Sequence, residues 1–396
     1  MLTLMLGIAM TSRAGEPLDV RVGIDVRGVT SDATQSFLNG GLGRARFDED
    51  HDGLRLGQAY LTARYRLSDT FSLHGDVLAY GDDHGGSVDV TQLYLNFRPF
   101  PQGPIRFSSK LGVFYPAFSM ENRGPAWTTV YTLTPSAINT WFGEELRAIG
   151  LEADVRWLGA SADYPGDIGL IAGIYGWNDP IGTEIASRGW ALHDRQTGLF
   201  GYLPAPSSAG GKIHEFREID GRPGYYVGAQ WRHGDHFDLR VFRYDNRADP
   251  AAFQHMYAWL TRFYAVGARF EADEHWTFIS QALTGETYIG PRDSWGAEWD
   301  MRSWFALASY EYAAWRFSSR YDSFRTQQRH GFGAPLMDDD GHAVTLSAAW
   351  TFTREWSAAL EWLRVTSTFA ARENVELAAQ QVEKQVQLAV RYQTRW

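Results

Sequence analysis

Polar and apolar residues alternate along most of this chain, and the last eleven residues, 386–396, show the pattern clearly. The residues at even-numbered positions are apolar except for Thr394. Those at odd-numbered positions include the polar residues Gln387, Arg391, Gln393 and Arg395. Because successive side chains of an extended strand point to opposite faces, this segment has one apolar face and one polar face. A soluble edge strand would alternate in the same way, so the rest of the chain has to decide between a soluble sheet and a membrane barrel.

The alternation recurs in about sixteen segments of roughly ten residues, the length that a tilted strand needs to cross an outer membrane. The predicted strands are 18–27, 59–67, 71–80, 88–98, 105–113, 147–157, 168–177, 224–232, 237–244, 262–270, 276–287, 302–312, 315–324, 343–352, 356–366 and 384–396. An even number of strands brings both termini to the same side of a barrel.

The connections between these segments alternate between short and long. Short polar turns are expected at 68–70, 99–104, 159–167, 233–236, 271–275, 313–314 and 353–355, whereas the longest connections are 116–145 and 179–223. Outer-membrane barrels have short periplasmic turns and long external loops, and unstructured loops of this length are unusual in a soluble domain. Tryptophans also gather at the strand ends, where amphipathic rings would lie at the membrane interface. The predicted fold is an all-β transmembrane antiparallel barrel; a soluble β-sandwich or propeller with these aromatics in its core is the alternative.

Composition narrows the classes of protein further. The chain has no cysteine, which excludes a disulfide-stapled secreted domain and cysteine-based metal or redox sites. Aromatic residues make up 15% of the chain at a mean hydropathy of only -0.33, as expected when apolar residues alternate with polar ones. The net charge of -10, with no basic cluster, argues against nucleic acid as a partner.

The first fourteen residues resemble the end of a secretory signal. An apolar run from Leu2 to Met10 is followed by Ser12 and Ala14, small residues suited to a cleavage site. The run is too short for a transmembrane helix, which needs roughly 20 apolar residues. Residues 1–14 are therefore predicted to be a signal peptide that lacks its basic start, a disordered or buried terminus being the alternative, and residues 15–396 a single barrel domain.

Several stretches carry a family resemblance. The closing strand ends at Trp396, an aromatic carboxy terminus, and the whole of 15–396 resembles a bacterial outer-membrane porin of the sixteen-stranded kind. A weaker likeness to the phosphate-selective porin O/P family rests on 110–114, 118–121, 147–151 and 320–324. Lysine occurs only at Lys110, Lys212 and Lys384, so the chain departs from that family's lysine-rich anion trap.

On each predicted strand, charged residues at the positions that face away from lipid are candidates for the pore lining. Each would be costly if it faced lipid near the bilayer midplane, and a lumen with both signs of charge holds water and tunes ion preference. The predicted pore-lining residues are Arg21, Arg64, Asp76, Arg106, Lys110, Arg156, Arg240, Arg316, Arg320, Asp322 and Arg391. For any one of these residues, a salt bridge within the wall is an equally good interpretation.

The resemblance also implies that the long connection 116–145 folds into the barrel and narrows the pore. Its aromatic residues would pack on the inner wall, while Glu121, Arg123, Glu144 and Glu145 would present charge to the passage. An external loop or a subunit contact is the alternative for this segment.

The function that follows is a water-filled channel in the outer membrane of a Gram-negative bacterium, for passive diffusion of small hydrophilic solutes or ions, with anions such as phosphate as one candidate. The expected partners are outer-membrane lipid and lipopolysaccharide, while the resemblance implies recognition of the closing strand at Trp396 by the barrel assembly machinery and a homotrimer. No catalytic, metal or cofactor site is predicted. An exporter of an acidic polysaccharide, a barrel enzyme and a closed barrel serving adhesion or scaffolding stay open as alternatives.

Overall fold

The computed structural model describes residues 17–82, 88–206, 211–331 and 337–396, and these form a closed barrel of sixteen antiparallel strands. Each strand pairs with the next along the barrel, and β1 pairs with β20 to close it. The barrel strands are β1 (Leu18–Ser31), β2 (Gly53–Arg66), β3 (Phe71–Ala79), β4 (Val88–Phe97), β5 (Ile105–Phe114), β6 (Ala148–Trp157), β7 (Gly166–Gly176), β10 (Gly224–His233), β11 (Phe237–Asp245), β14 (Trp259–Glu271), β15 (Trp276–Ile289), β16 (Ala297–Tyr312), β17 (Trp315–Gly331), β18 (Asp339–Thr351), β19 (Trp356–Phe369) and β20 (Gln380–Arg395). The predicted fold class is confirmed, and the predicted signal peptide lies outside the described residues.

Smaller elements occupy the connections. The long ones hold the helices α1 (Ala137–Glu145) and α2 (Thr183–Arg188) and two short hairpins, β8 (Leu203–Pro204) with β9 (Lys212–Ile213) and β12 (Phe253–Gln254) with β13 (Met256–Tyr257). Short 3₁₀ helices span Phe37–Asn39, Glu49–His51, Pro125–Trp127, Gly159–Ala162 and Ala370–Val375. Among the described residues, none of the helices is both long and apolar enough to cross a bilayer.

The two faces of the wall follow the alternation in the sequence. On β1, for example, Ile24 and Val26 point outward and are about two-fifths exposed, whereas Asp25 and Arg27 point inward and are buried. Exposed apolar side chains continue around the outer face, and tryptophans at the short-turn rim, Trp276, Trp315, Trp350 and Trp356, are about two-fifths exposed. This outer band suits lipid and an aromatic interface.

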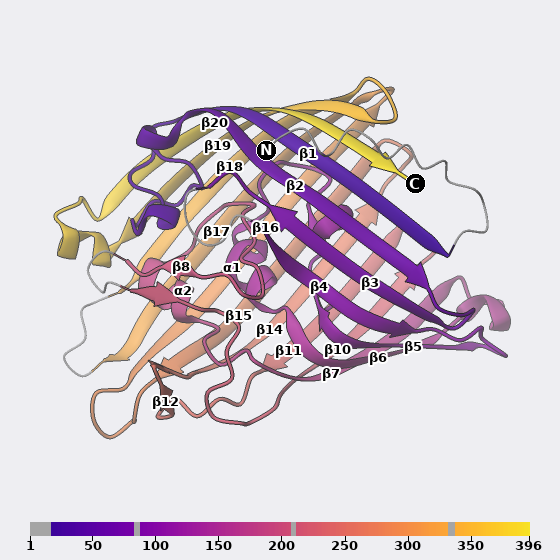
Figure 1. Ribbon diagram of the computed structural model, residues 1–396, viewed down its shortest axis with the longest axis horizontal. Coiled ribbons are helices and arrows are strands. Elements are labelled where there is room, and N and C mark those ends of the chain that lie inside the picture. The colour runs from indigo at the N-terminus through magenta and orange to yellow at the C-terminus, as the bar shows by residue number, and fades with distance from the viewer. Residues whose placement is uncertain (1–16, 83–87, 207–210, 332–336) are drawn as a thin grey trace.

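Both ends of the chain meet at the short-turn rim. The Trp396 backbone N–H donates to the Val20 carbonyl at 2.9 Å, and the Val20 N–H donates back to the Trp396 carbonyl at 3.1 Å. The terminal aromatic residue thus belongs to the seam where the first and last strands close the barrel. The long connections extend from the opposite rim (Figure 1).

The strands of the second half are longer than their alternation predicts. β16 begins at Ala297 instead of residue 302, and β17 continues to Gly331 instead of residue 324. The outward side chains of these extensions are charged, apart from polar ones such as Gln327, so the apolar pattern ends before the hydrogen-bonded ladder does. Their inward side chains, such as Trp299, Met301 and Thr326, are buried inside the barrel. Because these contacts stabilise the strands, β16 and β17 extend beyond the lipid band.

Candidate functional site

Three connections turn inward and fill the loop end of the barrel. We name them loop 1 (residues 32–52), loop 3 (115–147) and loop 4 (177–223), of which the structure describes all except 207–210. Helix α1 of loop 3 lies inside the wall, packed against β15, β16 and β17 (Figure 1). Loop 3 was expected to border an open, charged passage. At the height of α1, side chains packed against one another fill that space instead.

An aromatic cluster joins the three loops in the middle of the lumen. The ring of His193 in loop 4 stacks on Phe37 of loop 1 at 4.2 Å between centroids and meets Trp141 of α1 edge-on at 4.4 Å. Phe142 contacts Trp190 with the two rings tilted, at 5.6 Å between centroids. All of these side chains are almost completely buried. The expectation of a hydrated lumen is therefore wrong at this level, because apolar groups from the loops exclude water.

Loop 3 is fastened to the far wall through Arg320 of β17. Its guanidinium donates to the Thr134 carbonyl at 2.7 Å, to the Pro135 carbonyl at 2.9 Å and to Asp322 at 2.8 Å. Glu121 lies 3.5 Å away on the other side. Arg320 and Asp322 were expected to line the pore, but both are buried and act as anchors for the loop.

Two carboxylates also hold the amino terminus of α1. Glu121 accepts hydrogen bonds from the Ser136 N–H and from the Asn139 amide, both at 2.8 Å, and Asp322 accepts from the Ala137 N–H at 3.0 Å. The first N–H groups of a helix have no partner within it and carry partial positive charge, so anions are favoured there. The sequence suggested that Glu121 narrows the pore, whereas its carboxylate is fully buried in this contact.

Loop 4 is tied to the opposite wall through Asp194. This carboxylate pairs with Arg27 of β1 at 2.6 Å and with Arg46 of loop 1 at 3.1 Å, and Arg46 pairs with Asp82 at 3.0 Å. Burial by itself would raise the pKa of Asp194, but the two guanidinium groups outweigh it and hold that pKa well below its usual value. These ion pairs and those of Arg320, joined through the aromatic cluster, connect the wall at β1 to the wall at β17.

A glycine makes the reversal of loop 4 within this crowded space. Gly189, at the end of α2, has a φ of 72°, and a Cβ placed on it would lie 2.3 Å from a carboxylate oxygen of Asp339. Asp339 receives the Trp190 N–H at 2.8 Å and the Arg44 guanidinium at 2.6 Å, so the chain passes close to the wall here. Only glycine fits both the left-handed backbone and this approach.

Four buried glutamates meet between loop 3 and loop 4. They are Glu144, Glu145, Glu184 and Glu215, and they face Arg147, Arg188 and Arg195. Burial, followed by repulsion from Glu215 and Glu184, raises the pKa of Glu145 well above its usual value, and burial with repulsion from Glu144 does the same for Glu215. Glu144 and Glu145 were expected to present charge to a passage, but both side chains are buried in loop contacts.

This cluster predicts that the loop packing weakens as the pH rises. Burial raises the pKa of Glu144 from 4.5 to about 7, so the folded loops bind more protons than released loops, and stability is lost as the pH rises through that interval. We expect the thermal midpoint in detergent to fall between pH 5 and pH 8, and to fall less in an E145Q/E215Q variant. The exposed change E274Q serves as the matched control. An identical pH profile for wild type and E145Q/E215Q would contradict the prediction.

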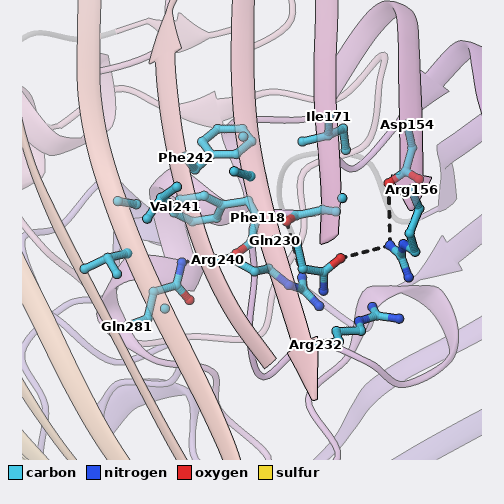
Figure 2. A pocket seen from close by; sticks show the side chains of 17 residues that line it. Phe118, Asp154, Arg156, Ile171, Gln230, Arg232, Arg240, Val241, Phe242 and Gln281 are labelled. Atoms are coloured by element: carbon cyan, nitrogen blue, oxygen red, sulfur yellow. Dashed lines mark hydrogen bonds and ion pairs between the residues drawn. The ribbon is translucent and has the colours of Figure 1, made fainter. Parts of the chain in front are cut away.

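Beneath loop 3, toward the short-turn rim, the lumen keeps a cavity of ≈ 80 Å³ lined by arginines (Figure 2). Three guanidinium groups converge on the single carboxylate of Asp238: Arg240 at 2.8 Å, Arg123 at 3.2 Å and Arg232 at 3.5 Å. Arg156 lies beside them, 2.9 Å from Gln230 and 3.6 Å from Asp154. Arg156, Arg232, Arg240 and Asp154 line the cavity, and Arg123 and Asp238 lie beside it. Four guanidinium groups thus face two carboxylates, so the cavity carries excess positive charge.

The other predicted pore-lining residues also point inward. On each strand they lie on the same face as the buried side chains. Lys110 pairs with Glu152 at 2.8 Å, Asp76 accepts from Gln92 at 2.5 Å, and Arg391 pairs with Asp25 at 2.9 Å. Arg21, Arg64, Arg106 and Arg316 lie closer to the short-turn rim. Sequence reasoning missed Arg232 and Arg123 as partners of Asp238; the alternation on β10 places Arg232 on the same face as Gln230.

The comparisons support the fold. No family model matches the chain, and no curated protein does. Among solved structures, the outer membrane channel DcaP of Acinetobacter baumannii aligns at a TM-score of 0.54 with 11% identity, covering 95% of this chain and 96% of that one. The anion-selective porin from Comamonas acidovorans (95% and 99% covered) and Salmonella typhi OmpF (95% and 97%) both align at 0.52 and 11% identity. The chain has the fold of outer-membrane porins. With its apolar outer band, this barrel is an outer-membrane protein of the Gram-negative type.

Proposed function

We propose that this barrel is an outer-membrane channel for small anionic solutes, and that its loop end is closed in the conformation described. The observation that carries the proposal is the arginine cavity at Asp238, where positive charge exceeds negative charge inside the lumen. A cavity lined by one sign of charge concentrates counter-ions and favours their entry. The anion-selective porin with the same fold adds support by analogy alone.

Passage requires movement of the loops. The aromatic cluster around His193 and the ion pairs of Asp194 hold loop 4 across the lumen, so a solute crosses only when these contacts open. The wall itself is a continuous hydrogen-bonded ladder and is expected to stay fixed. The channel is therefore proposed to conduct in brief openings rather than steadily.

Reversal potentials across a planar lipid bilayer test the selectivity. In a chloride gradient, the purified protein is expected to show an anion-selective reversal potential, and an R156Q/R232Q/R240Q variant a value shifted toward zero, because the variant removes three positive charges from the cavity. R98Q/R354Q, which changes exposed arginines at the short-turn rim, controls for surface charge. Cation selectivity of the wild type, or no shift in the triple variant, would contradict the proposal.

A closed barrel that serves adhesion or scaffolding is the second candidate, and the packed loops favour it. It predicts no conductance from a folded barrel under any voltage or pH. The same packing leaves little room for an acidic polysaccharide in the described conformation. Hydrolysis of lipid or peptide by the purified protein would instead support the barrel enzyme.

The homotrimer, the binding of lipopolysaccharide and the recognition of Trp396 by the assembly machinery are also proposals. The exposed position of Trp356, beside Tyr392 of the last strand at 4.9 Å, supports an outward aromatic face at the barrel seam. Cross-linking of the folded protein would give its subunit number.

A further inference from the structure

The outer face of β10 to β17 changes abruptly from apolar to charged, and the strand register shows where. One row of directly paired outward residues is apolar from β10 to β16, through Ala229, Val241, Val266, Ala282 and Trp304, and reaches Ser323 on β17. The row two residues nearer the loop rim runs through Val227, Arg243, Tyr264, Thr284, Arg302 and Arg325, and the one after it through Asp245, Arg262, Glu286 and Asp300. The change marks the upper boundary of the lipid band on this side.

Two hollows meet at this boundary. The lower one, of ≈ 640 Å³, is an apolar groove in which Ala229 and Ala282 form low points between larger side chains such as Val241 and Val266. The upper one, of ≈ 370 Å³, is lined by four arginines and two acidic residues: Arg243, Arg262, Arg302, Arg329, Glu286 and Asp300. Both are bordered by Tyr264 and Thr284, so the groove leads directly into the arginine pocket.

The acidic residues of this region do not neutralise all of its arginines. Glu286 pairs with Arg262, and Arg243 pairs with Asp245 at 3.6 Å. Arg329 is engaged by Asp300 and, at 3.6 Å, by Glu298. Arg302 and Arg325 sit directly opposite each other on β16 and β17, both exposed, and neither makes a side-chain hydrogen bond or ion pair with any described residue. Like charges placed opposite each other destabilise a sheet, so this pair is suited to an anion from outside the protein.

We propose that this surface binds a phosphate-bearing lipid of the outer leaflet. An acyl chain would lie in the groove over Val241 and Val266, and a phosphate would be held by Arg302 and Arg325 with Arg243 at its side. Guanidinium groups bind phosphate through paired hydrogen bonds, and the arginines lie next to the end of the lipid band, where a lipid phosphate would be. The inference depends on the membrane location and not on the proposed channel activity.

Binding of diphosphoryl lipid A to the folded protein in detergent, measured by native mass spectrometry, tests the proposal. We expect an R302Q/R325Q variant to bind it about tenfold more weakly than wild type, because two charge-assisted contacts to phosphate are lost. The R98Q/R354Q variant, with the same change in charge at the other rim, is expected to bind like wild type. Dephosphorylated lipid A is expected to bind wild type and R302Q/R325Q equally.

The A282W variant tests the groove separately. Its indole ring would occupy the groove on the outer face of the barrel, and the arginines would stay in place. It is expected to weaken binding of diphosphoryl lipid A several-fold while the barrel still migrates as a folded species on an unheated gel. Equal lipid binding by wild type and R302Q/R325Q would overturn the proposal. Competition by inorganic phosphate at the same concentration as lipid A would reassign the pocket to free anions, and loss of a subunit contact in R302Q/R325Q would reassign the face to an interface between copies.

Discussion

Replacement of Asp194 by alanine is expected to open the channel more often and to raise its mean conductance several-fold. The change removes the carboxylate shared by Arg27 and Arg46, which ties loop 4 to the wall at β1. Each hydrogen bond to a charged group contributes roughly 1.5–3 kcal/mol. Arg27 keeps Asp25 at 2.8 Å and Arg46 keeps Asp82, so the wall and loop 1 stay in place. Loop 4 loses these two ion pairs but keeps contacts such as its aromatic stacking and its hydrogen bond to Asp339, so it is released more often and not permanently.

Single-channel recording at neutral pH measures the effect, and limited trypsin digestion provides a second readout. Arg188 and Arg195 of loop 4 are buried in wild type and become sites of cleavage when the loop is released. D235A, at an exposed position in a short turn, is the matched control. If D194A folds, resists cleavage at these arginines and conducts like wild type, loop 4 is not the gate.

Replacement of Arg320 by alanine is expected to cause the largest loss of stability. It leaves Glu121 and Asp322 buried without their positive partner, which typically costs about 3–5 kcal/mol. The amino terminus of α1 would lose its fixed carboxylates in turn, because both accept hydrogen bonds from it. The measurement is the temperature at which the folded band disappears on a gel loaded without heating.

Two further variants serve as controls for R320A. R316A removes a half-buried arginine of the same strand, whose partial exposure limits its ion pair with Glu311 to about 1 kcal/mol or less. R320L/E121L/D322L removes both signs of charge together and is expected to recover part of the stability, since an apolar replacement leaves no buried charge unpaired. Equal unfolding temperatures for R320A and R316A would show that the Arg320 anchor contributes little.

Loop 4 and loop 3 are held at different parts of the barrel wall. Asp194 acts at the contact of loop 4 with β1, whereas Arg320 acts at the contact of loop 3 with β17. A variant that releases loop 4 is expected to alter conductance with little change in barrel stability. One that releases loop 3 is expected to alter both, because α1 packs directly on the strands.

The sequence by itself determined the barrel. Alternation of polar and apolar residues is a local property with a period of two, and a closed sheet in lipid is what satisfies it, so the strand number, the order of short and long connections and the inward parity of Arg156 or Arg240 could be predicted. The ends of β16 to β20 could not, because inward contacts with loops extend them past the apolar pattern.

Only the tertiary structure decided what fills the lumen. Glu121, Arg320 and Asp322 look in the sequence like any other inward charges, and their role as anchors depends on the path of loop 3, which brings Thr134 and Pro135 to the wall nearly two hundred residues away. Likewise, the cluster of His193, Phe37 and Trp141 joins three loops that are distant in sequence. Loops lack a repeating pattern, so their long-range contacts have no local signal to predict them.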